Sequence, residues 1–134
     1  LQPSSHENLP LEDQWILSQL ASVTVKVESE LKQYHYAEAA RAVYDFAWDH
    51  FCSFYVEMAK PRLQDPETRH QVQRVLAHVL DRMLRLLHPI TPFVTEAIWQ
   101  QLNKITRNRD FITGECSADW IVRASWPTPD AQHI

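Results

Sequence analysis

Residues 87–99, which read LHPITPFVTEAIW, contain the end of one helix, a short corner and the start of another helix. Pro89 ends the first helix, because its ring clashes with the preceding turn and its nitrogen carries no hydrogen. Thr91 is suited to cap the next helix, and Pro92 fits the first helical position, where a missing N–H costs nothing. The stretch therefore predicts a fixed angle between two long helices.

The two helices on either side of this corner are predicted to span residues 66–88 and 92–105. The first of them begins with Asp65 as its cap and Pro66 at its first position. Its apolar side chains recur every three or four residues and form a stripe of Val72, Val75, Leu76, Val79, Met83, Leu86 and Leu87. In the second, the side chains expected to face inward are Val94, Ile98, Leu102 and Ile105.

Two further helices are predicted upstream, over residues 11–34 and 36–60. The apolar stripe of the earlier helix consists of Ile16, Leu20, Val23, Val27, Leu31 and Tyr34. The stripe of the later helix consists of Ala40, Val43, Tyr44, Ala47, Phe51, Tyr55 and Met58. The later helix also carries aromatic residues beyond this stripe, which is typical of a central helix with several neighbours. We expect Pro61 to stop it after Lys60.

The fold class that follows is an all-α, antiparallel four-helix bundle with a short irregular C-terminal tail. Helices joined by short connectors favour antiparallel neighbours, and one glycine in 134 residues argues against a fold rich in hairpins. We expect one domain, with a lead-in over residues 1–9, the helical domain over 10–134 and the tail over 106–134. Trp126 in this tail is expected to pack back on the bundle.

Composition restricts the possible functions. The net charge of −4 argues against a protein whose main task is to grip a nucleic-acid backbone, although it allows a domain that adds local contacts. No apolar run approaches the length of a membrane span, so we expect no membrane partner. Cys52 is interpreted as a small buried hydrophobe, and reduced thiols with a cytoplasmic location are expected. Leu1 in place of a methionine suggests a piece of a longer protein.

Motifs for catalysis or metal binding are few, and we expect no catalytic residue, no metal site and no cofactor within this chain. Its single glycine leaves no phosphate-binding loop. Glu67 and His70 fit the E-x-x-H spacing of di-iron bundles, but that site needs a second copy of the motif and further carboxylates. The alternative for these two residues is a solvated first helical turn, where Glu67 suits the helix dipole.

Basic residues form two groups in the sequence. Lys60, Arg62 and Arg69 flank the turn between the second and third helices, and the segment after the fourth helix carries Lys104, Arg107 and Arg109. Either group could bind phosphates. Cations near the C-terminal ends of solvated helices are the alternative, because they suit the helix dipole without any ligand.

Three stretches of the chain carry a resemblance to a known family. Residues 11–20 follow the pattern D-x-W-I-L-S-x-L, residues 44–52 read YDFAWDHFC and are followed by Tyr55-Val56-Glu57, and residues 86–99 contain LLHP, TPFVTE and a tryptophan. In this order and spacing they resemble the anticodon-binding domain of class I aminoacyl-tRNA synthetases, most of all its valine-specific members. Ser53-Phe54 departs from the Asp-Trp that often follows the cysteine in this family.

The resemblance implies a helical domain that binds a tRNA anticodon stem–loop and packs against the catalytic domain of the same parent chain. The parent would be a ligase of protein biosynthesis that uses ATP and magnesium, whereas this part lacks the H-I-G-H and K-M-S-K-S motifs of amino-acid activation. The family's bundle usually opens with an earlier helix that is absent here. The residues expected to contact RNA are Lys60, Arg62, Arg107 and Arg109, with Arg41 as a further candidate if it faces outward from the second helix. The aromatic residues interpreted as core are Trp15, Trp48, Phe51, Tyr55 and Trp99.

Three alternatives stay open at this point. The same domain could come from an isoleucine or leucine enzyme. The chain could be a helical interaction scaffold without an RNA role, which its acidic net charge favours. It could also be a metalloenzyme bundle, for which the E-x-x-H spacing is the only support.

Overall fold

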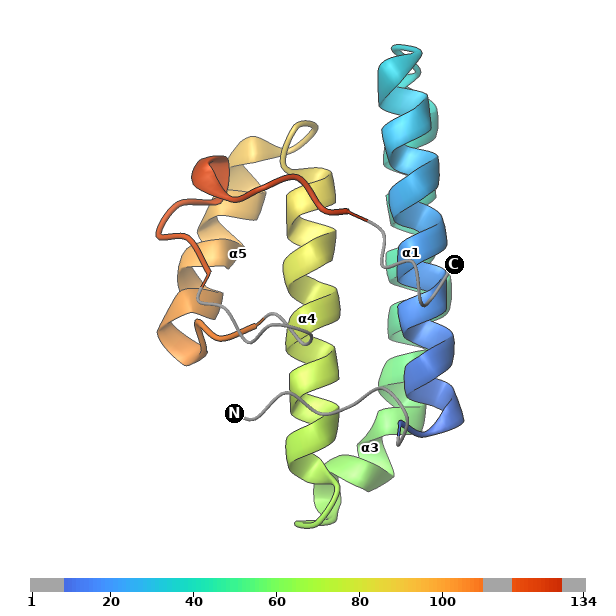
Figure 1. The fold of residues 1–134 in the computed structure, drawn as a ribbon, viewed down its shortest axis with the longest axis vertical. Helices are drawn as coiled ribbons and strands as arrows, with labels where there is room; N and C mark the ends of the chain where they lie inside the picture. Colours follow the sequence, from blue (N-terminus) through green and yellow to red (C-terminus); the bar gives the residue numbers. More distant parts are fainter. Residues whose placement is uncertain (1–8, 110–116, 129–134) are drawn as a thin grey trace.

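The computed structural model describes residues 9–109 and 117–128, and within these ranges the chain is helical and has no strand (Figure 1). The elements are α1 (Leu11–Lys32), α2 (Tyr36–Asp45), the π-helix η2 (Phe46–Tyr55), α3 (Val56–Gln64), α4 (Arg69–Leu87), α5 (Pro92–Ile105) and the 3-10 helix η3 (Ile121–Arg123). The predicted all-α fold class is confirmed.

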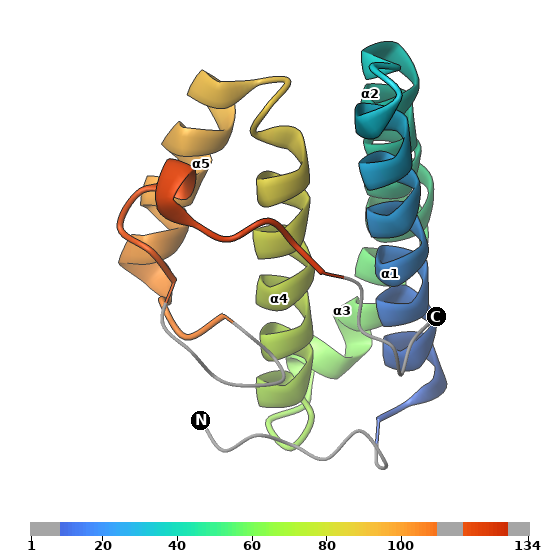
Figure 2. The same ribbon diagram turned by 45° about the horizontal axis from the view of Figure 1, so that its top comes forward.

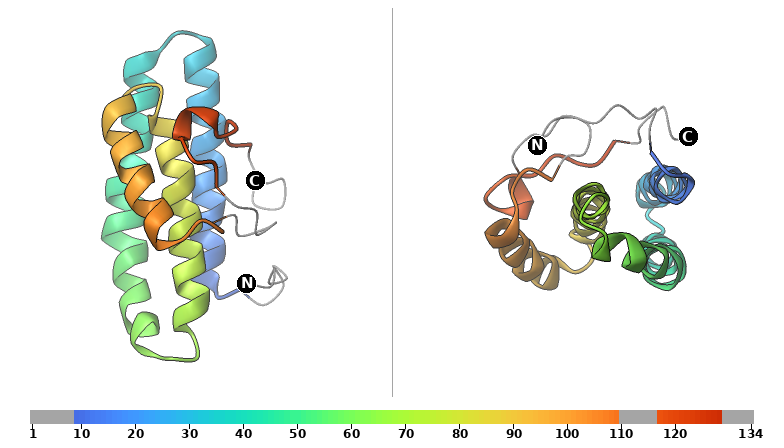
Figure 3. Two further views of the ribbon diagram at one scale, coloured as in Figure 1. Left: turned by 90° about the vertical axis from the view of Figure 1, so that its left-hand side faces the viewer. Right: turned by 90° about the horizontal axis from the view of Figure 1, so that it is seen from below.

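α2, η2 and α3 form one continuous rod that runs antiparallel to α1, and α4 packs against both (Figures 1 and 2). Seen along the helices, α4 lies between this pair and α5 (Figure 3). The segment after η3 crosses α4 towards α1, and Trp126 packs against the main core as expected. The four predicted helices are thus present, and the tail joins α5 to the rest of the bundle.

The main core is formed where α1, the α2–η2–α3 rod and α4 meet. The predicted stripe of α1 is buried from Ile16 to Val27, and that of α4 from Val72 to Leu86. At about 1.5–3 kcal/mol for each large apolar side chain, this burial is the main stabilising contribution. Leu31 is only half-buried and Tyr34 is exposed, because α1 ends at Lys32 and Tyr34 adopts a positive φ of 62° in the turn that follows.

The predicted stripe of the second helix is wrong in part. In α2 the inward face lies one position earlier than expected, with Ala39 and Ala42 buried in place of Ala40 and Tyr44. The π-helix η2 follows, where the N–H of Val56 bonds to the carbonyl of Phe51, five residues back, and in it Phe51 and Tyr55 are buried as predicted. The buried residues of the rod are Ala39, Ala42, Val43, Phe46, Phe51, Tyr55 and Ala59. Tyr44, Met58 and Cys52, which we expected to be buried, are exposed instead.

Pro61 does not end this helix, contrary to the prediction. α3 continues through it to Gln64. A proline inside a helix costs about 3 kcal/mol, and the residues of the next turn offset this cost through tertiary contacts. Arg62 bonds to the carboxylate of Asp13 on α1, and Leu63 packs against the main core.

The third helix also begins later than expected, at Arg69 instead of residue 66. The Asp65 carboxylate accepts a hydrogen bond from the N–H of Glu67 at 3.0 Å, and the Asp65 carbonyl accepts from Thr68 and Arg69. These bonds close a turn ahead of the helix, so Asp65 and Pro66 belong to that turn.

The fourth helix has the predicted bounds, but of the four side chains expected to face inward only Leu102 is buried, because the inward face lies one position further along the chain. Thr95, Trp99 and Leu102 are buried, whereas Val94 and Ile105 are 60% and 80% exposed. Trp99 decides this orientation, because its buried indole N–H donates to the carbonyl of Ala118 at 2.9 Å. The expected side-chain cap is absent from α5, and the Thr91 hydroxyl donates back to the carbonyl of Leu87.

Candidate nucleic-acid interface

The five basic residues expected to contact RNA do not gather on one surface. Arg41 lies on α2 beside the α1–α2 turn, and Lys60 lies on α3 towards the α3–α4 turn, which is at the other end of the molecule (Figure 1). Arg107 and Arg109 follow the end of α5. What separates the five is the number of protein partners that each side chain has.

Arg62 belongs to a buried network between α1 and α3. Its guanidinium donates two bonds to the Asp13 carboxylate, at 2.7 and 3.0 Å, and Asp13 is fully buried. The Tyr55 hydroxyl donates a third bond to Asp13 at 2.7 Å. Burial raises the pKa of Tyr55 and the bond to Asp13 raises it further, so the hydroxyl keeps its proton and remains a donor.

A further bond joins Arg62 to Gln71 on α4 at 3.0 Å. The hydrogen bond to Asp13 raises the pKa of Arg62, so the guanidinium stays charged in this partly buried position. The network therefore connects α1, the rod and α4. In this structure Arg62 supports the fold, and its hydrogen bonds are directed at protein acceptors instead of at a ligand.

Arg109 is 1% exposed and anchors the segment that follows α5. Its Nε donates to the Asp81 carboxylate at 2.9 Å, and its Nη1 donates to the Asn103 side chain and the Thr106 carbonyl. The guanidinium lies 4.4 Å from the centre of the Trp99 ring, a favourable cation–π contact. Burial lowers the pKa of Arg109, whereas the Asp81 carboxylate acts in the opposite direction. Arg109 is thus also a structural residue here.

The other three cations are accessible. Lys60 pairs with Glu57 at 2.6 Å, with both side chains more than half exposed. Arg107 is 46% exposed and donates to the Ser117 carbonyl and the Asp119 carboxylate. Arg41 is exposed and forms no ion pair within the residues that the structure describes. Surface pairs of this kind contribute little stability, so a phosphate could replace the carboxylate partners at small cost.

Exposed aromatic side chains follow Arg41 along the rod. Tyr44 is 64% exposed and lies three residues after Arg41. Trp48 is 61% exposed and lies four residues after Tyr44. Trp48 was expected in the core, and this prediction is wrong, because Trp48 lies two residues after the buried Phe46 and shares the outward face of Arg41 and Tyr44. Phe51, Tyr55 and Trp99 are buried as predicted. Trp15 is half-buried against His50 and Phe54, with ring centres 5.7 and 6.3 Å away.

A groove that sequence reasoning missed runs between the rod, α4 and α5. Its volume is about 620 Å³. Its apolar walls include Phe51, Leu80, Leu102 and Ile105, and polar side chains such as Asn108 also line it. The shifted inward face of α5 explains why the groove was missed, since Ile105 was assigned to the core and is 80% exposed.

Glu67 and His70, the residues of the E-x-x-H motif, do not belong to any group of three metal-ligating side chains among the described residues. Within the described residues, a group of three such side chains lies at the α1–α2 turn. No helix of the described part of the chain combines the length and the apolar character that a membrane span requires.

Comparisons with known proteins agree with the resemblance seen in the sequence. The family model for the anticodon-binding domain of tRNA ligase matches residues 13–134. A valine–tRNA ligase of Rhodopirellula baltica is 50% identical over 126 residues, and one of Thermotoga maritima is 50% identical over 128 residues. These alignments cover 94% and 96% of this chain but 12% and 13% of the relatives.

A valine–tRNA ligase of Gloeobacter violaceus is 53% identical over 97 residues, which is 72% of this chain and 11% of that relative. This chain therefore spans a small part of the length of the relatives that it matches. Because the family model covers most of the chain, the chain belongs to the family of anticodon-binding domains of tRNA ligases.

Proposed function

We propose that this chain is the anticodon-binding domain of a valine–tRNA ligase and that it binds the anticodon stem–loop of a valine tRNA. The observation that carries the proposal is the identity of 50% to a valine–tRNA ligase over 94% of the chain. The intact ligase would attach valine to its tRNA with ATP and magnesium, in the cytoplasm. This chain would supply binding surface, and the remainder of the ligase would supply the chemistry.

The accessible cations and aromatic residues suit this role. Arg41 and Lys60 would contact phosphates at the two ends of the rod, and Arg107 would contact them beside α5. Tyr44 and Trp48 offer exposed rings on which unpaired loop bases can stack. Arg62 and Arg109 would act indirectly, because they hold the helices and the segment that carry these groups.

A titration with anticodon hairpins tests the RNA proposal. A valine hairpin is expected to bind more tightly than isoleucine or leucine hairpins, with affinity that falls as salt rises. The double variant Lys60→Ala/Arg107→Ala should reduce the slope of log affinity against log salt by about one to two, because each phosphate contact contributes about 0.7–0.9. Trp48→Ala should weaken binding of the loop by about 1–3 kcal/mol with little change in that slope.

Lys26→Ala is the matched control, since Lys26 is exposed on α1 and is not among the proposed contacts. Affinities that are equal for the three hairpins would remove the valine assignment. Affinities that are unchanged in all the variants would favour the alternative of a helical scaffold without an RNA role.

We also propose that the remainder of the parent ligase covers the groove between the rod, α4 and α5. The relatives are several times longer than this chain, so most of such a ligase lies outside it. The groove is largely apolar, and Val94, Ile98 and Ile105 expose apolar surface on α5, of which Ile105 lines the groove. Exposed apolar surface of this kind is typical of a contact site.

The substitution Ile105→Asp tests whether this surface is exposed in the present chain and covered in the intact ligase. In the present chain it should change the free energy of unfolding by less than about 0.5 kcal/mol, because Ile105 is 80% exposed. In the intact ligase it should lower the melting temperature by several degrees, because a charge would be buried against the covering segment. Val25→Asp on α1 is the control and should be neutral in both. Equal effects of Ile105→Asp in both proteins would contradict the covering.

A further inference from the structure

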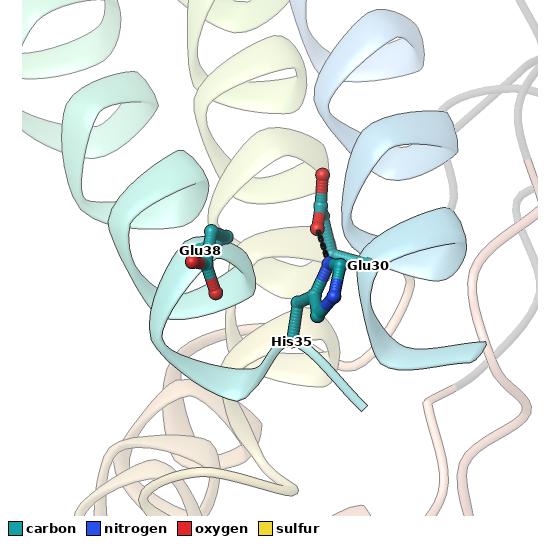
Figure 4. A group of neighbouring side chains, drawn as sticks. All are labelled: Glu30, His35 and Glu38. Carbon is teal, nitrogen blue, oxygen red and sulfur yellow. Dashed lines mark hydrogen bonds and ion pairs between the residues drawn. The ribbon is translucent and has the colours of Figure 1, made fainter. Parts of the chain in front are cut away.

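The turn between α1 and α2 brings together three side chains with metal-ligating atoms (Figure 4). Glu30 lies in the last turn of α1, His35 directly precedes α2, and Glu38 lies in the first turn of α2. One ligand atom from each lies within 4.8 Å of the other two. The sequence spacing did not reveal this group, because its members stand on two helices separated by a reversal of the chain.

The backbone holds His35 in place on both sides. Its N–H donates to the carbonyl of Glu30 at 2.8 Å, and its carbonyl accepts from the N–H of Ala39 at 3.0 Å. The backbone of His35 is therefore bonded to the end of α1 and to the start of α2 at once. This places its side chain between the two helix ends, beside Glu30.

The charge of the group is unbalanced. Lys32, the basic residue of the last turn of α1, pairs with Glu28 at 3.1 Å. Within the described residues, neither Glu30 nor Glu38 forms an ion pair with a lysine or arginine, although Arg41 follows on the same helix. The partner of Glu30 is His35, with 2.9 Å between the Nδ1 and Oε2 atoms. Glu30 is thus bonded to the imidazole, Glu38 lies close to both, and a divalent cation would neutralise the two carboxylates.

We propose that Glu30, His35 and Glu38 bind a divalent transition-metal ion of the zinc type. One imidazole nitrogen and two carboxylate oxygens form a donor set that suits Zn²⁺, whereas Mg²⁺ prefers oxygen ligands alone. Bonds of about 2.0–2.2 Å require the three ligand atoms to move to about 3.4 Å from one another. The side chains of this surface turn can rotate to reach that spacing. Water would take the fourth position, and the ion would replace the proton shared by His35 and Glu30.

The site would connect the end of α1 to the start of α2. An ion that binds the folded chain and not the unfolded chain stabilises the fold by mass action. Zinc should therefore raise the melting temperature, and the effect should depend on these side chains. This gives a readout that is independent of any RNA or ligase activity.

Calorimetric titration of the full chain with Zn²⁺, after removal of metals by a chelator, tests the proposal. One Zn²⁺ is expected to bind per chain, and His35→Ala and Glu38→Gln should each weaken binding at least tenfold. Both residues are exposed, so these variants should keep the helical circular-dichroism spectrum of the unchanged chain. Mg²⁺ in large excess should not compete.

His70→Ala is the matched control, because His70 is an exposed histidine of the E-x-x-H motif. It should leave both the zinc affinity and the zinc-induced rise in melting temperature unchanged. Absence of Zn²⁺ binding, equal binding by the His35→Ala variant, or loss of binding in the His70→Ala variant would each overturn the proposal.

Discussion

The substitution Asp13→Ala is expected to lower the free energy of unfolding by about 3–5 kcal/mol relative to the unchanged chain. The Asp13 carboxylate is fully buried and accepts two bonds from Arg62 and one from Tyr55. Its removal leaves a guanidinium and a hydroxyl in the interior without their acceptor, and the desolvation of both is then uncompensated. Urea denaturation followed by circular dichroism measures this loss.

Two milder substitutions in the same network serve as controls. Tyr55→Phe removes one neutral donor and should cost about 0.5–1.5 kcal/mol, because Asp13 keeps its bonds to Arg62. Glu12→Ala removes a more exposed partner of Arg62, at 3.3 Å, and should cost less than about 1 kcal/mol. An Asp13→Ala variant that loses no more than Glu12→Ala would show that the buried pair does not hold α1 to α3.

The positions of the helices could be predicted from the sequence because their signals are local. Pro89 and Pro92 mark the corner before α5, and the bounds of α5 follow from them. The same reasoning failed at Pro61, because the turn after it is held by Asp13, which lies far away in the sequence. A local rule cannot anticipate a partner that only the folded chain brings close.

The faces of the helices were harder to predict, since both faces of α5 carry apolar side chains. Periodicity placed Val94, Ile98 and Ile105 inward together with Leu102, and of these only Leu102 is buried. The indole of Trp99 settles the choice, because it needs both burial and an acceptor, and Ala118 provides that acceptor. The wider turn of the π-helix η2 could not be anticipated either, because no residue pattern in the sequence signals such a turn.

The candidate interface could also be predicted only in part. Arg62, Arg107 and Arg109 were all expected to contact RNA, with solvated cations at helix ends as the alternative. Their different roles depend on acidic partners elsewhere in the chain, which are Asp13, Asp119 and Asp81. Arg41 was expected to matter only if it faced outward, and it is exposed. The sequence could therefore nominate the cations, and only the fold could separate the accessible ones from the buried ones.

A chain with Asp81→Asn is expected to release the segment of residues 117–128 while the main core stays folded. The Asp81 carboxylate on α4 pairs with Arg109 at 2.9 Å and with Arg85 at 2.8 Å, and it accepts a bond from the Ser117 hydroxyl. An amide of the same shape cannot balance the charge of Arg109, which is almost fully buried, so about 3–5 kcal/mol should be lost at this anchor. The core between α1, the rod and α4 does not use Asp81.

Amide hydrogen exchange distinguishes this local release from global unfolding. In the Asp81→Asn variant, the segment 117–128 should exchange at least a hundredfold faster, and the indole N–H of Trp99 should lose its protection because its acceptor is Ala118. α1 should exchange at its former rate. Asp119→Ala, which removes an exposed partner of Arg107, is the control and should leave the segment protected. Unchanged exchange in the Asp81→Asn variant would contradict the anchor.

The same variant connects the fold to the proposed RNA contact. Arg107 is held by the Ser117 carbonyl, so release of the segment should also remove Arg107 from its position. Hairpin binding by the Asp81→Asn variant should therefore weaken about as much as binding by an Arg107→Ala variant, and combining the two substitutions should add little. Full additivity would mean that Arg107 contacts RNA without help from this anchor. Because Asp81 is buried and cannot contact RNA itself, we expect its effect on RNA binding to pass through the segment that it holds.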